Sequence, residues 1–313
     1  MNLKKPKFWD YKKPNIFAYL LYPIAVLIKI IVFFNKVKSP LKFKIKTICI
    51  GNMYIGGTGK TSLSIKINNI LNEKKIKSCF IKKFYPNQID EQNILKKNGK
   101  LFLSSKRIDA IKQAENENYK VAILDDGLQD KTIDYDLKLV CFNNINWIGN
   151  GMTLPSGPLR ENIKNLKYYS DVFLNGNLED LENIKKDIIK INSKIRIHVG
   201  KYIPINLNEF KKENNYLIFS GIGNHQTFVS MMKNNGFKII KDIEFPDHYT
   251  YKKKDIEKIL AVAKSLNCQV LTTEKDYLRL NIKDLNQINY IKSELKITNE
   301  ENFINSVLLN EIY

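Results

Sequence analysis

Four of the fourteen glycines lie within nine consecutive positions, in the segment CIGNMYIGGTGKTSLSIKI, and this clustering indicates a loop with a chemical role. A short apolar run at 47–50 precedes the loop and an amphipathic run at 61–71 follows it, which predicts a strand, a turn and a helix. Glycine permits left-handed backbone and lets N–H groups approach phosphate oxygens closely, while the helix N-terminus adds partial positive charge. The loop therefore predicts a nucleoside triphosphate site formed by Gly56, Gly57, Thr58, Gly59, Lys60 and Thr61.

Lys60 and Thr61 end this loop with residue types that phosphate sites use. The lysine would reach the terminal phosphates, and the threonine hydroxyl would hold Mg²⁺. The strict pattern GxxxxGK[ST] is not met, because Tyr54 occupies its first glycine and Gly51 lies three residues earlier. A plain glycine-rich turn between a strand and a helix is the alternative interpretation.

An apolar run at 121–124 ends in two acids, Asp125 and Asp126, in the segment VAILDDGLQD. A strand that ends in a carboxylate is typical of the second half of a P-loop site. One of the two carboxylates would coordinate Mg²⁺ directly or through water, offsetting phosphate charge during phosphoryl transfer. A solvated turn is the alternative interpretation of the same residues.

Three further segments carry polar side chains that could serve such a site. The loop NGMTLPSGPLRE, at 150–161, contains Arg160, one of only four arginines, among two glycines and two prolines. A planar two-pronged donor to phosphate or carboxylate is therefore indicated at this position. The acids of QIDE at 88–91 are, taken alone, typical of a solvated face, and His248 in FPDHY is, taken alone, typical of a structural histidine.

Short apolar runs alternate with polar helical stretches after residue 40, a pattern typical of a parallel sheet with helices between its strands. Strands are predicted at 47–50, 78–81, 121–124, 137–142 and 172–174. A second series begins near Ile195, with strands at 216–219, 238–240, 269–272 and 289–291 and helices at 226–235, 253–266 and 301–309. We therefore predict an α/β fold with a P-loop NTPase-like domain at 41–200 and a second, smaller α/β domain at 201–313 that closes the active-site cleft.

Residues 1–40 are predicted to form a membrane-associated helix with basic flanks. The segment at 16–34 is apolar except for its lysine and is about 28 Å long as a helix, the lower limit for spanning a bilayer. The first fifty residues contain 11 Lys and one acid, a charge of +10 out of the chain's +19. Such flanks favour an anionic membrane surface, where the helix would span the bilayer or lie in its interface. An ordinary buried helix is the alternative.

Five segments, taken in order, resemble the tetraacyldisaccharide 4′-kinase family, the lipid A kinases of Gram-negative bacteria. The family's GNxxxGGTGKT, DDGxQ, GNGxxLPxGPLRE, FPDH and TEKD segments match this chain at 51–61, 125–129, 149–161, 245–248 and 273–276. The resemblance implies transfer of the γ-phosphate of ATP, with Mg²⁺, to the 4′-hydroxyl of a tetraacylated glucosamine disaccharide 1-phosphate. It also implies action at the cytoplasmic face of the inner membrane. We further predict a monomer whose partners are the lipid substrate and an anionic membrane surface, and no nucleic acid.

The resemblance also implies roles for individual residues. Lys60, Gln129 and Arg160 would contact ATP, and the metal would be surrounded by Thr61, Asp125, Asp126 and Glu161. Asp90, in IDE, would accept the hydroxyl proton with His248 orienting it, and the acceptor side would include Tyr85 and Arg107. The chain departs from the family after the second strand, where it reads IKKFYPNQIDE in place of a glycine-rich segment.

Two other function classes compete with a lipid kinase. A GTPase or ATPase of metallochaperone or regulatory type would use the same loop and aspartates. Guanine readers need an [NT]KxD segment, however, and in TEKD the residues Lys275 and Asp276 are adjacent. A basic nucleic-acid-binding module would explain the charge of +19 but not the apolar N-terminal segment or the sparse arginines.

Overall fold

The computed structural model describes residues 5–34, 39–85, 89–176, 181–247, 249–280 and 285–310. Its contacts divide the chain into two units. Of the described residues, the larger unit contains those up to Gly200 and those from Ile297 onward, and the smaller one contains Lys201–Lys296. Residues 297–310 are thus grouped with the larger unit, and the domain limits 1–40, 41–200 and 201–313 stay predictions.

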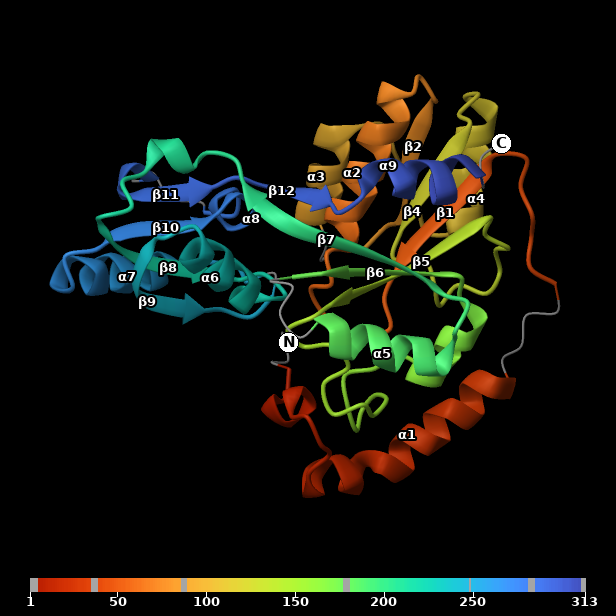
Figure 1. Ribbon diagram of the computed structural model, residues 1–313, viewed down its shortest axis with the longest axis horizontal. Coiled ribbons are helices and arrows are strands. Elements are labelled where there is room, and N and C mark those ends of the chain that lie inside the picture. The colour runs from red at the N-terminus through yellow and green to blue at the C-terminus, as the bar shows by residue number, and fades with distance from the viewer. Residues whose placement is uncertain are drawn as a thin grey trace. The chain divides into compact units, whose positions relative to one another are not determined.

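Within the described residues, an eight-stranded sheet has the strand order β12–β7–β6–β5–β1–β4–β2–β3 (Figure 1). Neighbouring strands from β7 to β3 pair in parallel. The predicted α/β fold with a parallel sheet is therefore confirmed. The strands are β1 (Lys46–Gly51), β2 (Ser78–Lys83), β3 (Leu101–Ser104), β4 (Val121–Asp125), β5 (Leu137–Asn143), β6 (Asp171–Asn175), β7 (Arg196–Pro204) and β12 (Ser293–Ile297).

Helices cover both faces of this sheet, which explains why its central strands are apolar throughout. On one face, α4 (Arg107–Asn116) and α5 (Leu181–Ile191) bury aliphatic side chains in a core that includes Leu124 and Val140. On the other face, α2 (Lys60–Glu73) packs against β1, β2 and β4, and α3 (Ile89–Asn98) packs against α2. Phe303, at the end of α9 (Glu300–Phe303), packs with Phe173 of β6 and is followed by η6 (Ile304–Leu309).

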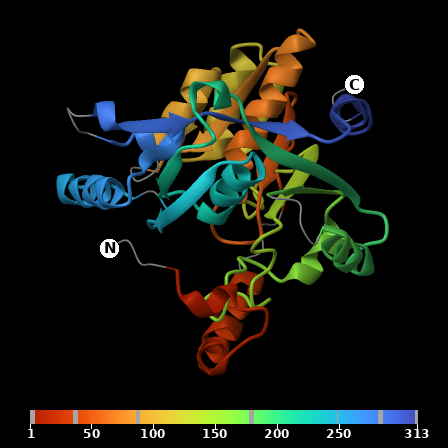
Figure 2. The same ribbon diagram turned by 60° about the vertical axis from the view of Figure 1, so that its left-hand side comes forward.

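The N-terminal segment forms η1 (Lys7–Asp10) and α1 (Ile16–Phe34), as the apolar run predicts. Figures 1 and 2 both show α1 at one edge of the larger unit, apart from the sheet. One narrow face of α1, with Ala18 and Ala25, is buried, whereas Leu20 and Leu27 on the rest of its surface are 68% and 60% exposed. None of the helices in the described residues is both long enough and apolar enough to cross a bilayer.

The smaller unit has its own parallel four-stranded sheet, in the order β11–β10–β8–β9. Its core lies between this sheet and helices that pack on it. The elements are β8 (Asn215–Ser220), α6 (His225–Asn234), β9 (Lys238–Glu244), α7 (Lys253–Ser265), β10 (Gln269–Thr273), α8 (Glu274–Tyr277) and β11 (Ile288–Ile291), with the short turns η4 (Leu207–Glu209) and η5 (Leu285–Gln287).

The TEKD segment has a structural place in this unit. Thr273 caps α8, and its hydroxyl donates to Asp276 Oδ2 at 2.7 Å. The buried Asp276 Oδ1 accepts hydrogen bonds from the Gly221 N–H at 3.0 Å and the Tyr251 hydroxyl at 2.9 Å. These bonds join the ends of β8 and β10 to the loop before α7.

Lowering the pH is expected to destabilise the larger unit through Asp171, the first residue of β6. Its buried carboxylate accepts two hydrogen bonds of 2.8 Å from Arg196 and lies 2.8 Å from His198 Nε2. Burial alone would raise the pKa of Asp171, but His198 and Arg196 outweigh it and hold the pKa below its usual value. Since the folded-state pKa is the lower one, this stabilisation is complete above about pH 5 and is lost as the pH falls through the depressed pKa.

Urea unfolding at a series of pH values measures this dependence. In Asp171→Asn the free energy of unfolding should change less between about pH 5 and pH 2 than in the wild type. Asp187→Asn is the matched control, because this carboxylate is 55% exposed and lies 3.6 Å from Lys190. Equal pH dependence in the wild type and Asp171→Asn would contradict the assignment.

Candidate nucleotide-binding site

The glycine-rich loop connects β1 to the N-terminus of α2. Gly56 and Gly59 have φ angles of +120° and +79°, in the left-handed region that glycine adopts without strain. Gly59 is the N-cap of α2 and has no side chain of its own that could accept from the first-turn N–H groups, so this helix N-terminus suits an anion. Two asparagine side chains fix the backbone of the loop. The Asn52 side chain donates to the Gly56 carbonyl at 3.3 Å, and the Asn175 amide donates to the Thr58 carbonyl.

The aspartate pair lies beside this loop because β4 is the parallel neighbour of β1. Ile50 is in register with Asp125, so both strands end at the same edge of the sheet. The Thr61 hydroxyl donates to Asp125 Oδ2 at 3.2 Å, and Lys60 Nζ lies 3.9 Å from Asp126 Oδ2. The structure thus brings together the two motifs that the sequence placed 64 positions apart.

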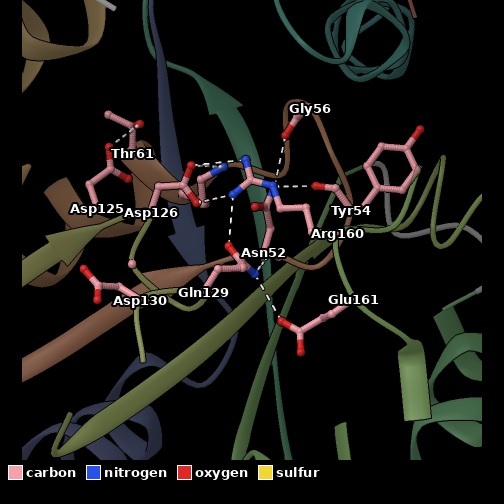
Figure 3. A network of polar contacts seen from close by, with 12 residues as sticks. Asn52, Tyr54, Gly56, Thr61, Asp125, Asp126, Gln129, Asp130, Arg160 and Glu161 are labelled. Atoms are coloured by element: carbon pink, nitrogen blue, oxygen red, sulfur yellow. Dashed lines mark hydrogen bonds and ion pairs between the residues drawn. The ribbon is translucent and has the colours of Figure 1, made fainter. Parts of the chain in front are cut away.

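Asp126 pairs with two cationic side chains, Lys60 and Arg160, and Figure 3 shows the Arg160 guanidinium pointing toward its carboxylate. Its φ of +65° turns the chain away from β4, and Arg160 donates to Oδ1 at 2.7 Å and to Oδ2 at 3.2 Å. Burial alone would raise the pKa of Asp126, but Lys60 and Arg160 outweigh it and keep the pKa below its usual value. The carboxylate is therefore ionised at neutral pH and orients both cations.

Gln129 connects Arg160 to Glu161 in the same network (Figure 3). Its side-chain oxygen accepts from Arg160 at 3.2 Å, and its amide donates to Glu161 Oε1 at 3.1 Å and to the Asn52 carbonyl at 3.1 Å. Glu161 also accepts from Asn165 at 2.9 Å and from the Tyr169 hydroxyl at 3.3 Å. Glu161 is thus held by neutral donors, away from the Thr61 and Asp125 pair.

Thr61 and Asp125 are the residues that fit a divalent metal best. Asp125 Oδ1 is buried and has no hydrogen-bond partner among the described residues, and a hydroxyl beside a carboxylate is a donor set that Mg²⁺ accepts. Asp126 is engaged by Lys60 and Arg160, and Glu161 by its own donors. Within the described residues, no group of three or more His, Cys, Asp or Glu side chains could hold a metal. Phosphate oxygens and water would therefore supply the remaining ligands.

The residues expected on the acceptor side are less fully described. Tyr85 follows β2, is 40% exposed, and accepts a hydrogen bond from the Gln92 side chain at its carbonyl. Arg107 points into the loop after β4, donating to the Asp126 carbonyl and to Asp130 Oδ2 at 3.1 Å. Asp90 is the second residue of α3, but its side chain lies outside the described residues, as does the whole of His248.

The segment before α1, which is distant in sequence from the motifs, also makes hydrogen bonds to the loops of the site. In η1, the Trp9 carbonyl accepts from the Asn150 N–H at 2.9 Å, and its indole donates to the Pro155 carbonyl at 3.1 Å. Tyr54 donates its hydroxyl to Asp10, which also pairs with Lys5 at 2.7 Å. The segment before α1 is therefore attached to both loops of the nucleotide site.

Sequence reasoning missed three side chains of this site. Asn52 and Asn175 hold the glycine-rich loop, and Lys82 lies 2.7 Å from Asp125 Oδ2. The available signal for Lys82 was its place at the end of an apolar strand, next to the sheet edge where the aspartates lie.

A parallel strand, a glycine-rich loop and a helix whose lysine and threonine face an aspartate pair define a P-loop nucleotide-binding protein. The family model described as tetraacyldisaccharide-1-P 4′-kinase matches residues 17–313. The tetraacyldisaccharide 4′-kinase of Pelagibacter ubique is 61% identical over an alignment of 315 positions, gaps included, that covers 99% of each chain. That of Rickettsia akari is 33% identical over an alignment of 334 positions that covers 99% of this chain and 97% of the relative. The chain belongs to the tetraacyldisaccharide 4′-kinase family, as the five ordered segments predicted.

A solved structure supports the fold. LpxK from Aquifex aeolicus, crystallised with ATP, is similar with a TM-score of 0.64 and 22% identity, over 95% of this chain and 98% of that one. At this identity the likeness concerns the fold, and it agrees with the α/β architecture described above.

Proposed function

We propose that this chain is an ATP-dependent lipid kinase that transfers the γ-phosphate of ATP to the 4′-hydroxyl of a tetraacylated glucosamine disaccharide 1-phosphate. The observation that carries the proposal is the convergence of Lys60 and Thr61 with Asp125 and Asp126, in a chain that belongs to a family of such kinases. The readings as a GTPase or a nucleic-acid-binding module have no comparable support.

The residues of the loop would bind and orient the triphosphate. The first-turn N–H groups of α2 and the Lys60 ammonium present positive charge to phosphate oxygens, and Arg160 adds a planar donor. Asp126 keeps both cations in place before the substrate arrives, so less reorganisation is needed at the moment of reaction. Thr61 and Asp125 would hold Mg²⁺, which when bound offsets charge on the phosphates.

Asp90 is the proposed general base, and His248 is the residue proposed to orient it. Asp90 would accept the proton of the 4′-hydroxyl, with His248 orienting the carboxylate. Asp90→Asn is expected to lower product formation by about 10²- to 10⁴-fold, because a general base contributes that much, while nucleotide binding is retained. Steady-state kinetics with a fluorescent ATP analogue as the binding probe separate the two effects. Normal turnover with weakened nucleotide binding would mean that Asp90 serves the nucleotide instead.

Transfer of label from γ-labelled ATP into the lipid phase tests the proposed function. The purified chain with Mg²⁺, detergent and the disaccharide 1-phosphate is expected to label the lipid, and GTP should support this poorly. Release of inorganic phosphate without labelled lipid would favour a regulatory ATPase. Retention on RNA or DNA that falls steeply with salt, with no labelled lipid, would favour the nucleic-acid module.

The proposed place of action is the cytoplasmic face of the inner membrane, with α1 in the bilayer interface. Its exposed stripe, formed by Leu20, Ile24, Leu27 and Ile31, would enter the apolar region while the flanking lysines meet anionic headgroups. Truncating the N-terminus is a poor test, because it would also remove the Trp9 contacts to the loop at 150–161.

Two substitutions within α1 test this placement. Leu20→Glu with Leu27→Glu is expected to release the protein from vesicles that contain an anionic lipid, since each change puts a charge on the membrane-facing stripe. Leu278→Glu, at a residue that is 63% exposed in the smaller unit, is the matched control and should leave binding unchanged. Sedimentation with vesicles measures both. Undiminished sedimentation of the double variant would contradict the placement.

A further inference from the structure

Lys82 is a buried lysine inside the candidate nucleotide site. It is the fifth residue of β2, which pairs with β4, and its side chain is 3% exposed. Its Nζ lies 2.7 Å from Asp125 Oδ2 and 2.8 Å from Glu91 Oε2, a residue of α3. Moving an ammonium out of water is costly, and such a group persists in a protein interior when carboxylates pair with it.

The charge of Lys82 is fixed by these partners. The Lys82 Nζ is within hydrogen-bond distance of one oxygen of each carboxylate, an arrangement that stabilises the charged ammonium. A positive charge thus lies at the carboxyl ends of β2 and β4, next to the first turn of α2.

Lys82 and the proposed metal share one carboxylate. Asp125 Oδ2 accepts from both Lys82 and Thr61, while Asp125 Oδ1 is buried without a partner among the described residues. A divalent cation at Thr61 and Asp125 would bind beside an ammonium held on the same group. Two cations on one buried carboxylate repel each other, and little water is present to screen them.

We propose that Lys82 is a positioning residue that acts as a tethered counter-ion for Asp125, neutralising it when no metal is bound and opposing Mg²⁺ binding in the absence of nucleotide. The proposal rests on the proposed function, because it takes Thr61 and Asp125 as the metal ligands. The negative charge of a bound triphosphate would offset the repulsion between the Lys82 ammonium and Mg²⁺, so that metal and nucleotide bind together. Glu91 gives the ammonium a second acceptor, so Lys82 need not leave its site when the metal engages Asp125.

Mn²⁺ binding to the nucleotide-free full-length chain, measured by the EPR signal of free Mn²⁺, tests this inference. The wild type is expected to bind Mn²⁺ weakly, and Lys82→Met to bind it at least about tenfold more tightly, a difference of about 1.4 kcal/mol. Lys83→Met removes the same charge one residue further on, where Nζ lies over the Tyr85 ring, and should change the affinity less than about twofold. Adding Asp125→Asn to Lys82→Met should abolish the gain.

A charge-matched variant keeps the test decisive if Lys82→Met does not fold. The double substitution Lys82→Gln with Glu91→Gln removes one positive and one negative charge, so the local net charge is unchanged while Asp125 loses its counter-ion. It too should bind Mn²⁺ at least about tenfold more tightly than the wild type. Wild-type affinity in this variant, or a gain that survives Asp125→Asn, overturns the inference.

The proposed metal site is tested separately. Asp125→Asn alone should weaken Mn²⁺-dependent binding of a non-hydrolysable ATP analogue. If it does so while the Lys82 variants bind Mn²⁺ like the wild type, the counter-ion role fails and the metal site stands. If Asp125→Asn changes nothing, the metal assignment itself fails, and the role of Lys82 fails with it.

Discussion

Lys60→Ala is expected to lower the turnover of lipid phosphorylation by about 10²- to 10³-fold, the usual effect of removing one placed donor from a transition state. Lys60 is the first residue of α2, its side chain is 14% exposed, and its Nζ is held 3.9 Å from Asp126. Phosphoryl transfer depends on such placed charge more than on covalent chemistry by the protein. Alanine keeps the helix, because it has the highest helix propensity, so the loss would be one of charge.

Initial rates at saturating ATP and lipid measure the effect of Lys60→Ala. Lys66→Ala is the matched control, because Lys66 lies on the same helix and its Nζ is 3.0 Å from Glu300. Lys66→Ala also removes one lysine charge and one ion pair from α2, but away from the glycine-rich loop, and should leave turnover within about twofold of the wild type. A Lys60→Ala enzyme that turns over as fast as the Lys66→Ala control would remove Lys60 from the phosphate site.

Asp126→Asn is expected to lower turnover by about 10²-fold, because the carboxylate that orients Lys60 and Arg160 becomes neutral. Asparagine is the informative replacement. Asp126 has a φ of +65°, and asparagine tolerates the left-handed region better than alanine does, so the backbone stays unstrained. The effect should fall on turnover and on ATP affinity together, because both cations lose their partner.

The control for Asp126→Asn is Asp134→Asn. Asp134 carries a carboxylate that is 49% exposed and lies 3.9 Å from Lys42, away from the nucleotide loop. Its neutralisation should leave both turnover and ATP affinity unchanged. Equal kinetics of Asp126→Asn and the wild type would show that Lys60 and Arg160 need no anchoring carboxylate, and would contradict the network in Figure 3.

The central strands could be predicted from the sequence, because each is a short apolar run between polar segments. The run at 121–124 lies within Val121–Asp125, and that at 47–50 lies within Lys46–Gly51. The meeting of Lys60 with Asp126 also followed from the pattern, since the carboxyl ends of parallel strands share one edge of a sheet. Helices at 226–235 and 253–266 were evident from their periodicity and correspond to α6 and α7.

Other features depended on contacts that no local pattern encodes. The strand β3 has only four residues, and three of them are partly exposed, so its apolar signal is weak. The four residues expected around the metal divide into different environments, with Asp126 between cations and Glu161 among neutral donors. Lys82 looks like a strand-terminal surface lysine until the order β4–β2 places it against Asp125.

The attachment of η1 to the nucleotide loops was likewise invisible in the sequence. Trp9 and Asn150 are far apart in the chain, and their backbone hydrogen bond requires the left-handed turn at Gly149. A β-carbon built at Gly149 would lie 2.1 Å from the Trp9 carbonyl oxygen, which explains the need for glycine there.

The position of the transferred phosphate is the sharpest test of the proposed kinase reaction. After reaction of the purified chain with ATP, Mg²⁺ and the disaccharide 1-phosphate, ³¹P and ¹H NMR of the extracted lipid should show one new phosphomonoester, on the 4′ carbon, beside the original 1-phosphate. A lipid that carries only its 1-phosphate while ATP is consumed, or a new phosphate at another carbon, would contradict the account.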